Sequence, residues 1–166
     1  MALTRKIVIS LLGGALIVIG LSIYVSWTWE QEAKEGWSPE ASKIKSAQIQ
    51  IKDRLIQAEI AATTEEHYLG LSGRKELCAD CGLLFSFPDR QERFFVMREM
   101  NFPLDIIFID QNRIISLASD LLPEGKQPEN IYASGEPVQF VLELNGGYSA
   151  AYNFQVGDQV EIIYED

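Results

Sequence analysis

The pattern of hydrophobic and polar positions changes twice along the chain, and each change marks a boundary. From Ile7 to Trp29 the sequence carries no charged residue, and Arg5 and Lys6 stand immediately before it. As a helix, these 23 residues would be about 34 Å long, which is enough to cross the hydrocarbon core of a bilayer once. We therefore predict that residues 1–29 form a short cytoplasmic tip and a single transmembrane anchor.

The residues that flank this stretch predict its orientation. Basic residues lie only on its amino side, and Trp27 and Trp29 mark its carboxyl end as an interfacial aromatic belt would. The N-terminus is therefore expected in the cytoplasm and the rest of the chain outside it. A cleaved signal peptide is the main alternative, with a buried core helix as another. Signal peptides have an apolar core of about 7–15 residues that ends at small residues, and neither feature is found here.

The next segment, residues 30–46, mixes charged with small residues and contains Gly36 and Pro39, so we predict a flexible tether. From residue 47 onward the hydrophobic period becomes two. Ile49 and Ile51 alternate with polar neighbours, and the alternation resumes at Ile56 after the Asp53–Arg54 turn. This pattern predicts a β-hairpin at the start of one β-rich domain over residues 47–166.

A short helix is expected after the hairpin, because Thr63 and Glu66 have the spacing of a capping box and Gly70 follows Leu69. Apolar runs bounded by turn residues then predict strands over 83–87, 93–98, 104–109, 113–118, 138–144 and 160–164, with a helical turn within 148–154. About eight short strands favour a mainly β fold. We expect a compact antiparallel β-sandwich or partly closed barrel, jelly-roll-like, with one or two short helices.

Six short motifs follow one another in an order that resembles a known family. They are Glu65-Glu66 leading into Gly70-Leu71 and Arg74, Gly82-Leu83-Leu84-Phe85, Phe95-Val96-Met97-Arg98, Pro103-Leu104-Asp105-Ile106-Ile107-Phe108, Val141-Leu142-Glu143 and Gly157-Asp158. Over about residues 61–162 the chain resembles domain-of-unknown-function family 192, an uncharacterised bacterial and archaeal family. The resemblance implies a compact jelly-roll-type sandwich that is secreted or tethered to a membrane. It implies no activity, because none is established for the family.

Charge excludes one class of partner. The chain after the anchor contains 24 acidic and 12 basic residues, a net charge of −12. Nucleic acids and anionic lipid headgroups are bound through basic surfaces, so neither is expected as a partner. The acidic balance either keeps the surface soluble or attracts cationic ligands and metal ions.

Cys78 and Cys81 form a C-x-x-C pair in the part of the chain expected outside the cytoplasm, where thiols tend to form disulfides. A structural disulfide is the favoured interpretation. Thiol–disulfide exchange, a metal site and inert free thiols are the alternatives. A zinc site needs about four ligands, and the sequence offers only His67 and Asp80 in addition, so we predict no metal and no cofactor. His67 is otherwise expected on a solvated helix face.

Charged residues within apolar strands are the strongest candidates for a site, because a charge rarely lies in a core unpaired. They are Arg98, Asp105 and Glu143, with Arg74 on a preceding loop. They either form arginine–carboxylate pairs between strand ends, lie on strand faces that reach water, or line a ligand-binding cleft. In a further arrangement, Asp105 and Glu143 act as general acid and base in one cleft, as in sugar hydrolysis.

The sequence contains no recognisable nucleophile motif, which weighs against an enzyme. The favoured hypothesis is a membrane-anchored extracytoplasmic module that binds a small-molecule ligand or an envelope protein. The binding hypothesis predicts Arg74 or Arg98 at the site and aromatic residues such as Phe95 or Tyr148 at its rim. A hydrolase that uses Asp105 and Glu143 is an alternative, as is an interaction domain for neighbouring membrane proteins.

Overall fold

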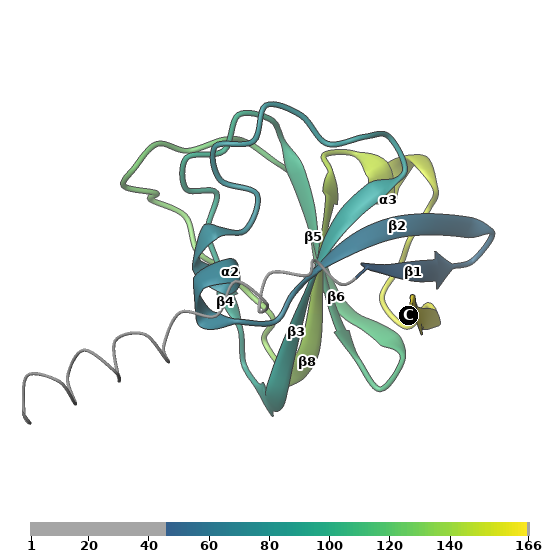
Figure 1. Cartoon of the computed structure of the whole chain (residues 1–166). Helices are drawn as coiled ribbons and strands as arrows, with labels where there is room; N and C mark the ends of the chain where they lie inside the picture. The colour runs from purple at the N-terminus through teal and green to yellow at the C-terminus, as the bar shows by residue number, and fades with distance from the viewer. Residues whose placement is uncertain (1–45, 166) are drawn as a thin grey trace, which may run out of the picture. The chain divides into compact units, whose positions relative to one another are not determined.

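A computed structural model of the protein describes residues 46–165 (Figure 1). The predicted anchor and almost all of the predicted tether lie outside the described residues. Within the described part of the chain, no helix is long and apolar enough to cross a membrane.

The predicted hairpin is confirmed. Strands β1 (Ser46–Ile51) and β2 (Arg54–Ala61) pair in antiparallel fashion, with Ile49 opposite Ile56. Lys52 and Asp53 make the turn, one residue earlier than predicted, because Arg54 already belongs to β2 and Lys52 adopts a positive φ of 54°. The alternation of the sequence therefore directs one side of the hairpin into the core.

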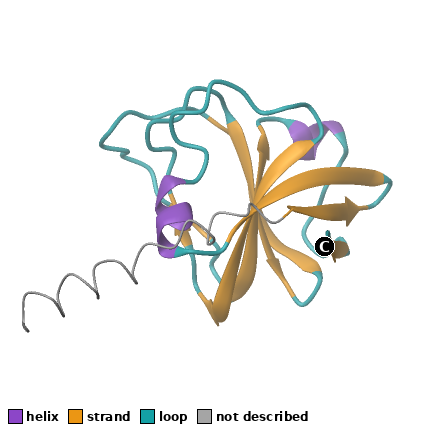
Figure 2. Ribbon diagram, viewed as in Figure 1, coloured by secondary structure: helices purple, strands orange, loops and turns teal. Residues whose placement is uncertain are grey.

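Seven strands form a single sheet, drawn in orange in Figure 2. The other five are β3 (Cys81–Gln91), β5 (Leu104–Asp110), β6 (Arg113–Leu121), β8 (Val138–Asn145) and β9 (Val160–Tyr164), in the spatial order β6-β5-β8-β3-β2-β1-β9. Backbone hydrogen bonds between residues 112–114 and 157–160 join the beginnings of the edge strands β6 and β9. The sheet consequently curls into a half-barrel.

This architecture confirms the predicted mainly β fold and its partly closed barrel alternative, and it corrects the alternative of an antiparallel two-sheet sandwich. Strands β2 and β3 run parallel, because residues 62–80 form a long crossover between them rather than a tight turn. The strand predicted over 93–98 shortens to β4 (Phe94–Phe95), which pairs with β7 (Tyr132–Ala133) in a separate small sheet. Strand β7 was not predicted because it lies in a loop rich in proline and glycine.

Two short helices complete the fold. Thr63 is the N-cap residue of helix α2 (Thr64–Leu69), and both hydrogen bonds of the predicted capping box with Glu66 are present. Helix α3 (Tyr148–Ala151) supplies the predicted helical turn. No residue of α2 is fully buried, so this helix depends on a few contacts to stay on the sheet.

The two faces of the curled sheet carry separate hydrophobic clusters. All seven strands contribute to the first cluster, which includes Ile49, Ile56, Leu84, Ile107 and Leu142 and fills the curl. The second cluster includes Leu83, Phe85, Ile106, Phe108 and Val141 on the other face, together with Met97 and Met100 from the loop after β4. Strand β5 is buried along its whole length because it has a cluster on each side.

Candidate functional site

A cavity of about 410 Å³ opens on the face of the sheet that carries the second cluster. Helix α2 and the residues just after it form one wall, and the segment around β4 forms another. The residues important for its chemistry are His67, Tyr68, Phe85, Phe95, Arg98 and Glu143. The sequence motifs that contain Phe85, Phe95 and Glu143 thus meet in one place.

Glu143 is the chemically unusual residue of this cavity. It lies on β8 opposite Leu83 of β3 and Ile106 of β5, so its side chain projects among apolar neighbours. The residue is 5% exposed, and its Oε2 atom is buried without a hydrogen-bond partner. Burial raises the pKa of Glu143 to about 8, although the positive charge of Arg74 acts in the opposite direction. The carboxyl group is therefore mostly protonated at neutral pH.

Aromatic rings line the same cavity as this carboxyl group. Phe85 and Phe95 pack edge to face with their centroids 4.9 Å apart, and Phe95 packs similarly on Phe108 at 6.0 Å. His67 lies 4.5 Å from the ring of Phe87. Such walls suit an apolar or aromatic ligand body, because aromatic faces bury much area and prefer defined packing geometries.

The expectation of a solvated His67 is wrong. The residue is half-buried, and its Nε2 lies 3.0 Å from the carbonyl oxygen of Ala61. Helix α2 rests on the sheet through this contact and through the packing of the imidazole on Phe87. A six-residue helix gives too few positions for a periodic apolar face, so the sequence alone did not indicate which side faces the sheet.

Arg98 stands at the rim of the cavity. Its guanidinium lies 4.0 Å above the ring of Tyr68 and donates a hydrogen bond to the Tyr68 carbonyl oxygen. Among the described residues no carboxylate forms a salt bridge with Arg98. Arg98 thus holds the end of α2 through Tyr68, and no carboxylate among the described residues binds its guanidinium.

Gly70 preserves the space between α2 and the carboxyl group. Its φ is +50°, and a Cβ atom at this position would lie 3.3 Å from Cζ of Phe85 and 3.9 Å from Oε2 of Glu143. A side chain here would be strained and would crowd the floor of the cavity.

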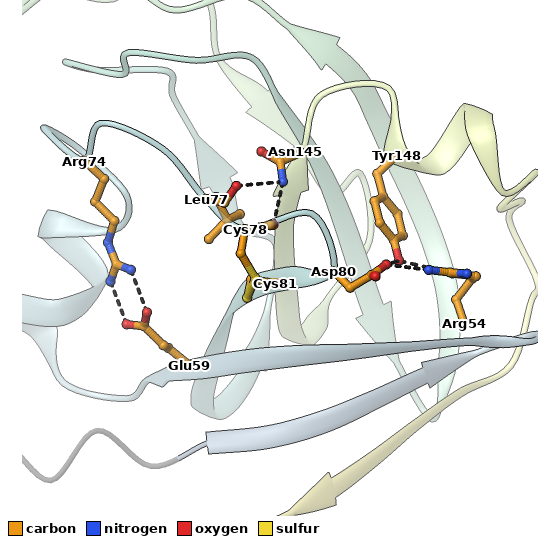
Figure 3. The surroundings of a disulfide bond; sticks show 9 residues. All are labelled: Arg54, Glu59, Arg74, Leu77, Cys78, Asp80, Cys81, Asn145 and Tyr148. Atoms are coloured by element: carbon orange, nitrogen blue, oxygen red, sulfur yellow. Dashed lines mark hydrogen bonds and ion pairs between the residues drawn. A yellow bond between two sulfur atoms is a disulfide. The ribbon is translucent and has the colours of Figure 1, made fainter.

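Arg74 takes the structural role that was one of its predicted alternatives. Both of its terminal nitrogens donate to the carboxylate of Glu59, each at 2.7 Å (Figure 3). This bidentate pair lowers the pKa of Glu59. Arg74 does not line the cavity, although its positive charge acts to lower the pKa of Glu143.

Asp105 is fully buried, and both oxygens of its carboxylate accept hydrogen bonds from backbone donors. It accepts hydrogen bonds from the N–H groups of Asp120 at 2.7 Å, Gly147 at 2.9 Å and Ser149 at 2.6 Å. Its cross-strand partner is Leu144, whereas Glu143 is opposite Ile106, so the two carboxyl groups point to opposite faces of the sheet. The predicted acid–base pair in one cleft is therefore not formed.

A disulfide joins Cys78 to Cys81 in the loop before β3 (Figure 3). The Asn145 amide donates to the carbonyl oxygen of Cys78 at 2.9 Å and holds this loop against β8. Asp80 within the loop accepts a hydrogen bond from the Tyr148 hydroxyl at 2.8 Å. The Tyr148 hydroxyl group thus binds the loop that contains Asp80, and Tyr148 does not line the cavity with Phe95.

No group of three His, Cys, Asp or Glu side chains within residues 46–165 is arranged to hold a metal ion.

The sequence profile of domain-of-unknown-function family 192 (DUF192, "Uncharacterized ACR") matches residues 47–162. The chain belongs to this family. The resemblance seen in the sequence motifs is thereby confirmed, and the match begins one residue into β1. A search of curated proteins finds no match.

Two solved structures are similar to the DUF192 domain described above. One is a candidate transcription regulator from Sinorhizobium meliloti 1021, with 27% identity and a TM-score of 0.64, covering 71% of this chain and 92% of that one. The other is a protein of unknown function from Novosphingobium aromaticivorans DSM 12444, with 30% identity and a TM-score of 0.63, covering 70% of this chain and 83% of that one.

Proposed function

We propose that this DUF192 protein is a membrane-anchored extracytoplasmic module that binds a small organic ligand in the cavity beneath α2. The buried and unpartnered carboxyl group of Glu143 is the observation that carries this proposal. A buried polar group without a hydrogen bond costs about 1–3 kcal/mol, and native proteins contain few of them. A ligand that supplies the missing partner recovers this cost on binding.

The surroundings of Glu143 support a small-molecule site. A volume of about 410 Å³ falls within the range of about 300–1,000 Å³ that is common for such sites. The walls are mainly apolar and aromatic, and a few polar groups stand at fixed positions. This combination gives a ligand both buried area and orientation.

The anchored, extracytoplasmic placement rests on the sequence. The uncharged segment 7–29, with basic residues on its amino side alone, supports a single span with the β domain outside. The acidic balance of the chain after this segment supports a ligand other than nucleic acid. The placement suggests that the ligand is encountered in the envelope.

A fragment screen by ligand-observed NMR tests the proposal, with the full chain held in lipid nanodiscs. We expect aromatic fragments with a polar group to bind the wild type and to lose affinity at least tenfold in Glu143→Gln. Glu161→Gln is the matched control, because Glu161 is exposed on β9, away from the cavity. The proposal fails if no fragment binds, or if every bound fragment is indifferent to Glu143→Gln.

A further inference from the structure

We infer that the ligand carries a protonated amine, whose ammonium group pairs with the carboxylate of Glu143 while its apolar body lies against Phe85 and Phe95. This inference rests on the proposed function and names the chemical class of the ligand.

The neighbours of Glu143 on the adjoining strands supply no hydrogen-bond partner. Leu83 and Ile106 flank it on the neighbouring strands, and neither side chain can form a hydrogen bond. Gly70 lies above it without a side chain, and a Cβ built there would be 3.9 Å from Oε2. Glu143 lines the cavity. A donor group on the ligand would therefore satisfy the carboxyl group from the cavity.

The arginines close to the cavity form no hydrogen bond with the carboxyl group of Glu143. Arg74 is the positive charge that acts on Glu143, but both of its terminal nitrogens are bound to Glu59. Arg93 pairs with Asp89 and lies over Phe87, 3.9 Å from the ring centroid. Arg93 lines the cavity, and its Nε atom is buried without a hydrogen-bond partner, but neither guanidinium donates to Glu143. An ammonium group would supply the missing donor.

The walls of the cavity favour an ammonium group, whereas Arg98 acts against one. Arg98 lies beside Tyr68 in the lining of the cavity, and its positive charge repels a cation. Glu92 contributes a second carboxylate to the lining of the cavity. Aromatic faces attract cations, and the acidic domain as a whole raises their local concentration. The carboxyl groups of Glu92 and Glu143 and the aromatic faces are thus the features of the cavity that favour an ammonium group.

Binding an amine must release a proton. The free protein carries a proton on Glu143, because burial raises its pKa to about 8. When the ammonium enters, the O–H bond of the carboxyl group breaks and its proton passes to the buffer. The ammonium keeps its three protons and donates to the resulting carboxylate. Affinity should therefore rise with pH up to about 8, and by about tenfold between pH 6 and pH 7.

Other titratable groups face the same cavity and must be separated from this effect. His67 and Tyr68 face it from α2, and Glu92, Arg93 and Arg98 face it from the segment around β4. The variant Glu143→Gln retains all of these groups, so it isolates the contribution of Glu143.

Isothermal titration calorimetry tests the inference with 2-phenylethylamine and 2-phenylethanol, which share an aromatic body and differ in the donor group. The full chain in nanodiscs is titrated at pH 6, 7 and 8 in amine-free buffers. We expect the amine to bind at least tenfold more tightly than the alcohol at pH 8, with the pH dependence given above. Glu143→Gln should abolish both effects, and Glu161→Gln should preserve them.

Three outcomes would overturn the amine class without overturning the cavity as a ligand site. The alcohol could bind as tightly as the amine, the preference for the amine could persist in Glu143→Gln, or neither probe could bind while other fragments occupy the cavity. Failure of every fragment in the NMR screen would instead contradict the proposed function itself.

Discussion

Asp105 and Glu143 lie on neighbouring strands but are offset by one residue, and this offset directs their carboxyl groups to opposite faces of the sheet. Asp105 is opposite Leu144 and Glu143 is opposite Ile106. Three backbone N–H groups bind Asp105, whereas no described residue donates to Glu143. Two acidic residues in similar apolar strands thus have different surroundings: one binds backbone N–H groups, and the other has no hydrogen-bond donor among the described residues.

Replacing Asp105 by alanine should destabilise the domain strongly. The substitution leaves three N–H groups without their acceptor, and each buried unsatisfied group costs about 1–3 kcal/mol. We expect the free energy of unfolding from urea titration to fall by about 3 kcal/mol or more. Glu161→Ala on the exposed surface serves as the control and should change it little. A loss below about 1 kcal/mol would show that these hydrogen bonds are not structural.

Glu143 should make the stability of the domain depend on pH. The folded state binds its proton more tightly than the unfolded state, because burial raises the pKa from an ordinary 4.5 to about 8. The folded state therefore holds more protons between these values, and its stability should fall as pH rises from about 4.5 through 8. The slope for this single group approaches about 1.4 kcal/mol per pH unit.

Glu143→Gln isolates this contribution, because glutamine keeps the shape of the side chain and does not titrate. Urea titrations of both proteins at several pH values should give free energies of unfolding whose difference grows in favour of Glu143→Gln above pH 5. A difference that is constant with pH would mean that Glu143 titrates in the folded protein as it does in the unfolded chain.

The disulfide should contribute modestly to stability. A loop closed by a sequence separation of only three residues removes little entropy from the unfolded chain, about 2 kcal/mol by the loop-entropy relation. Cys78→Ser/Cys81→Ser should therefore unfold at lower urea concentration and yet remain folded. Reductant should shift the wild type by a similar amount and leave the double variant unchanged. Complete unfolding by reductant would show that the loop holds more of the fold than its few contacts indicate.

The orientation of the chain in the membrane is testable independently of the ligand. A reporter enzyme that folds only outside the cytoplasm, fused after Asp166, should be active, because basic residues precede segment 7–29 and keep the N-terminus inside. Replacing Arg5 and Lys6 by glutamate should reduce this activity. An inactive wild-type fusion, with the same reporter active on a known exported protein, would contradict the proposed placement.

Local features of the fold were predictable because neighbouring residues determine them. The capping box at Thr63 and Glu66 and the alternation around the first hairpin both appear as expected. The arrangement of strands was less predictable, because a period of two does not specify which strands become neighbours. Nothing local to β2 or β3 indicates that they run parallel, since this follows from the path of residues 62–80.

The candidate site was predictable in part for the same reason. Glu143 and Arg98 were identified because charges within apolar strands are unusual, and both line the cavity. Two other residues that line the cavity could not be identified from the sequence. Phe85 has the pattern of an ordinary core residue, and His67 has the pattern of a surface residue. The sequence also could not separate Asp105 from Glu143, because the donors that bind Asp105 come from the distant residues Asp120, Gly147 and Ser149.

The titration of Glu143 in the ligand-free protein is the most direct test of the site. The side-chain carboxyl carbon can be followed by NMR in protein labelled with carbon-13 at glutamate, and Glu143→Gln assigns the signal by its loss. We predict a midpoint near pH 8, as burial without a partner requires. A midpoint near the ordinary value of 4.5 would mean that the carboxyl group is solvated or paired. This result would contradict the proposal that the unpartnered carboxyl group binds a ligand in the cavity.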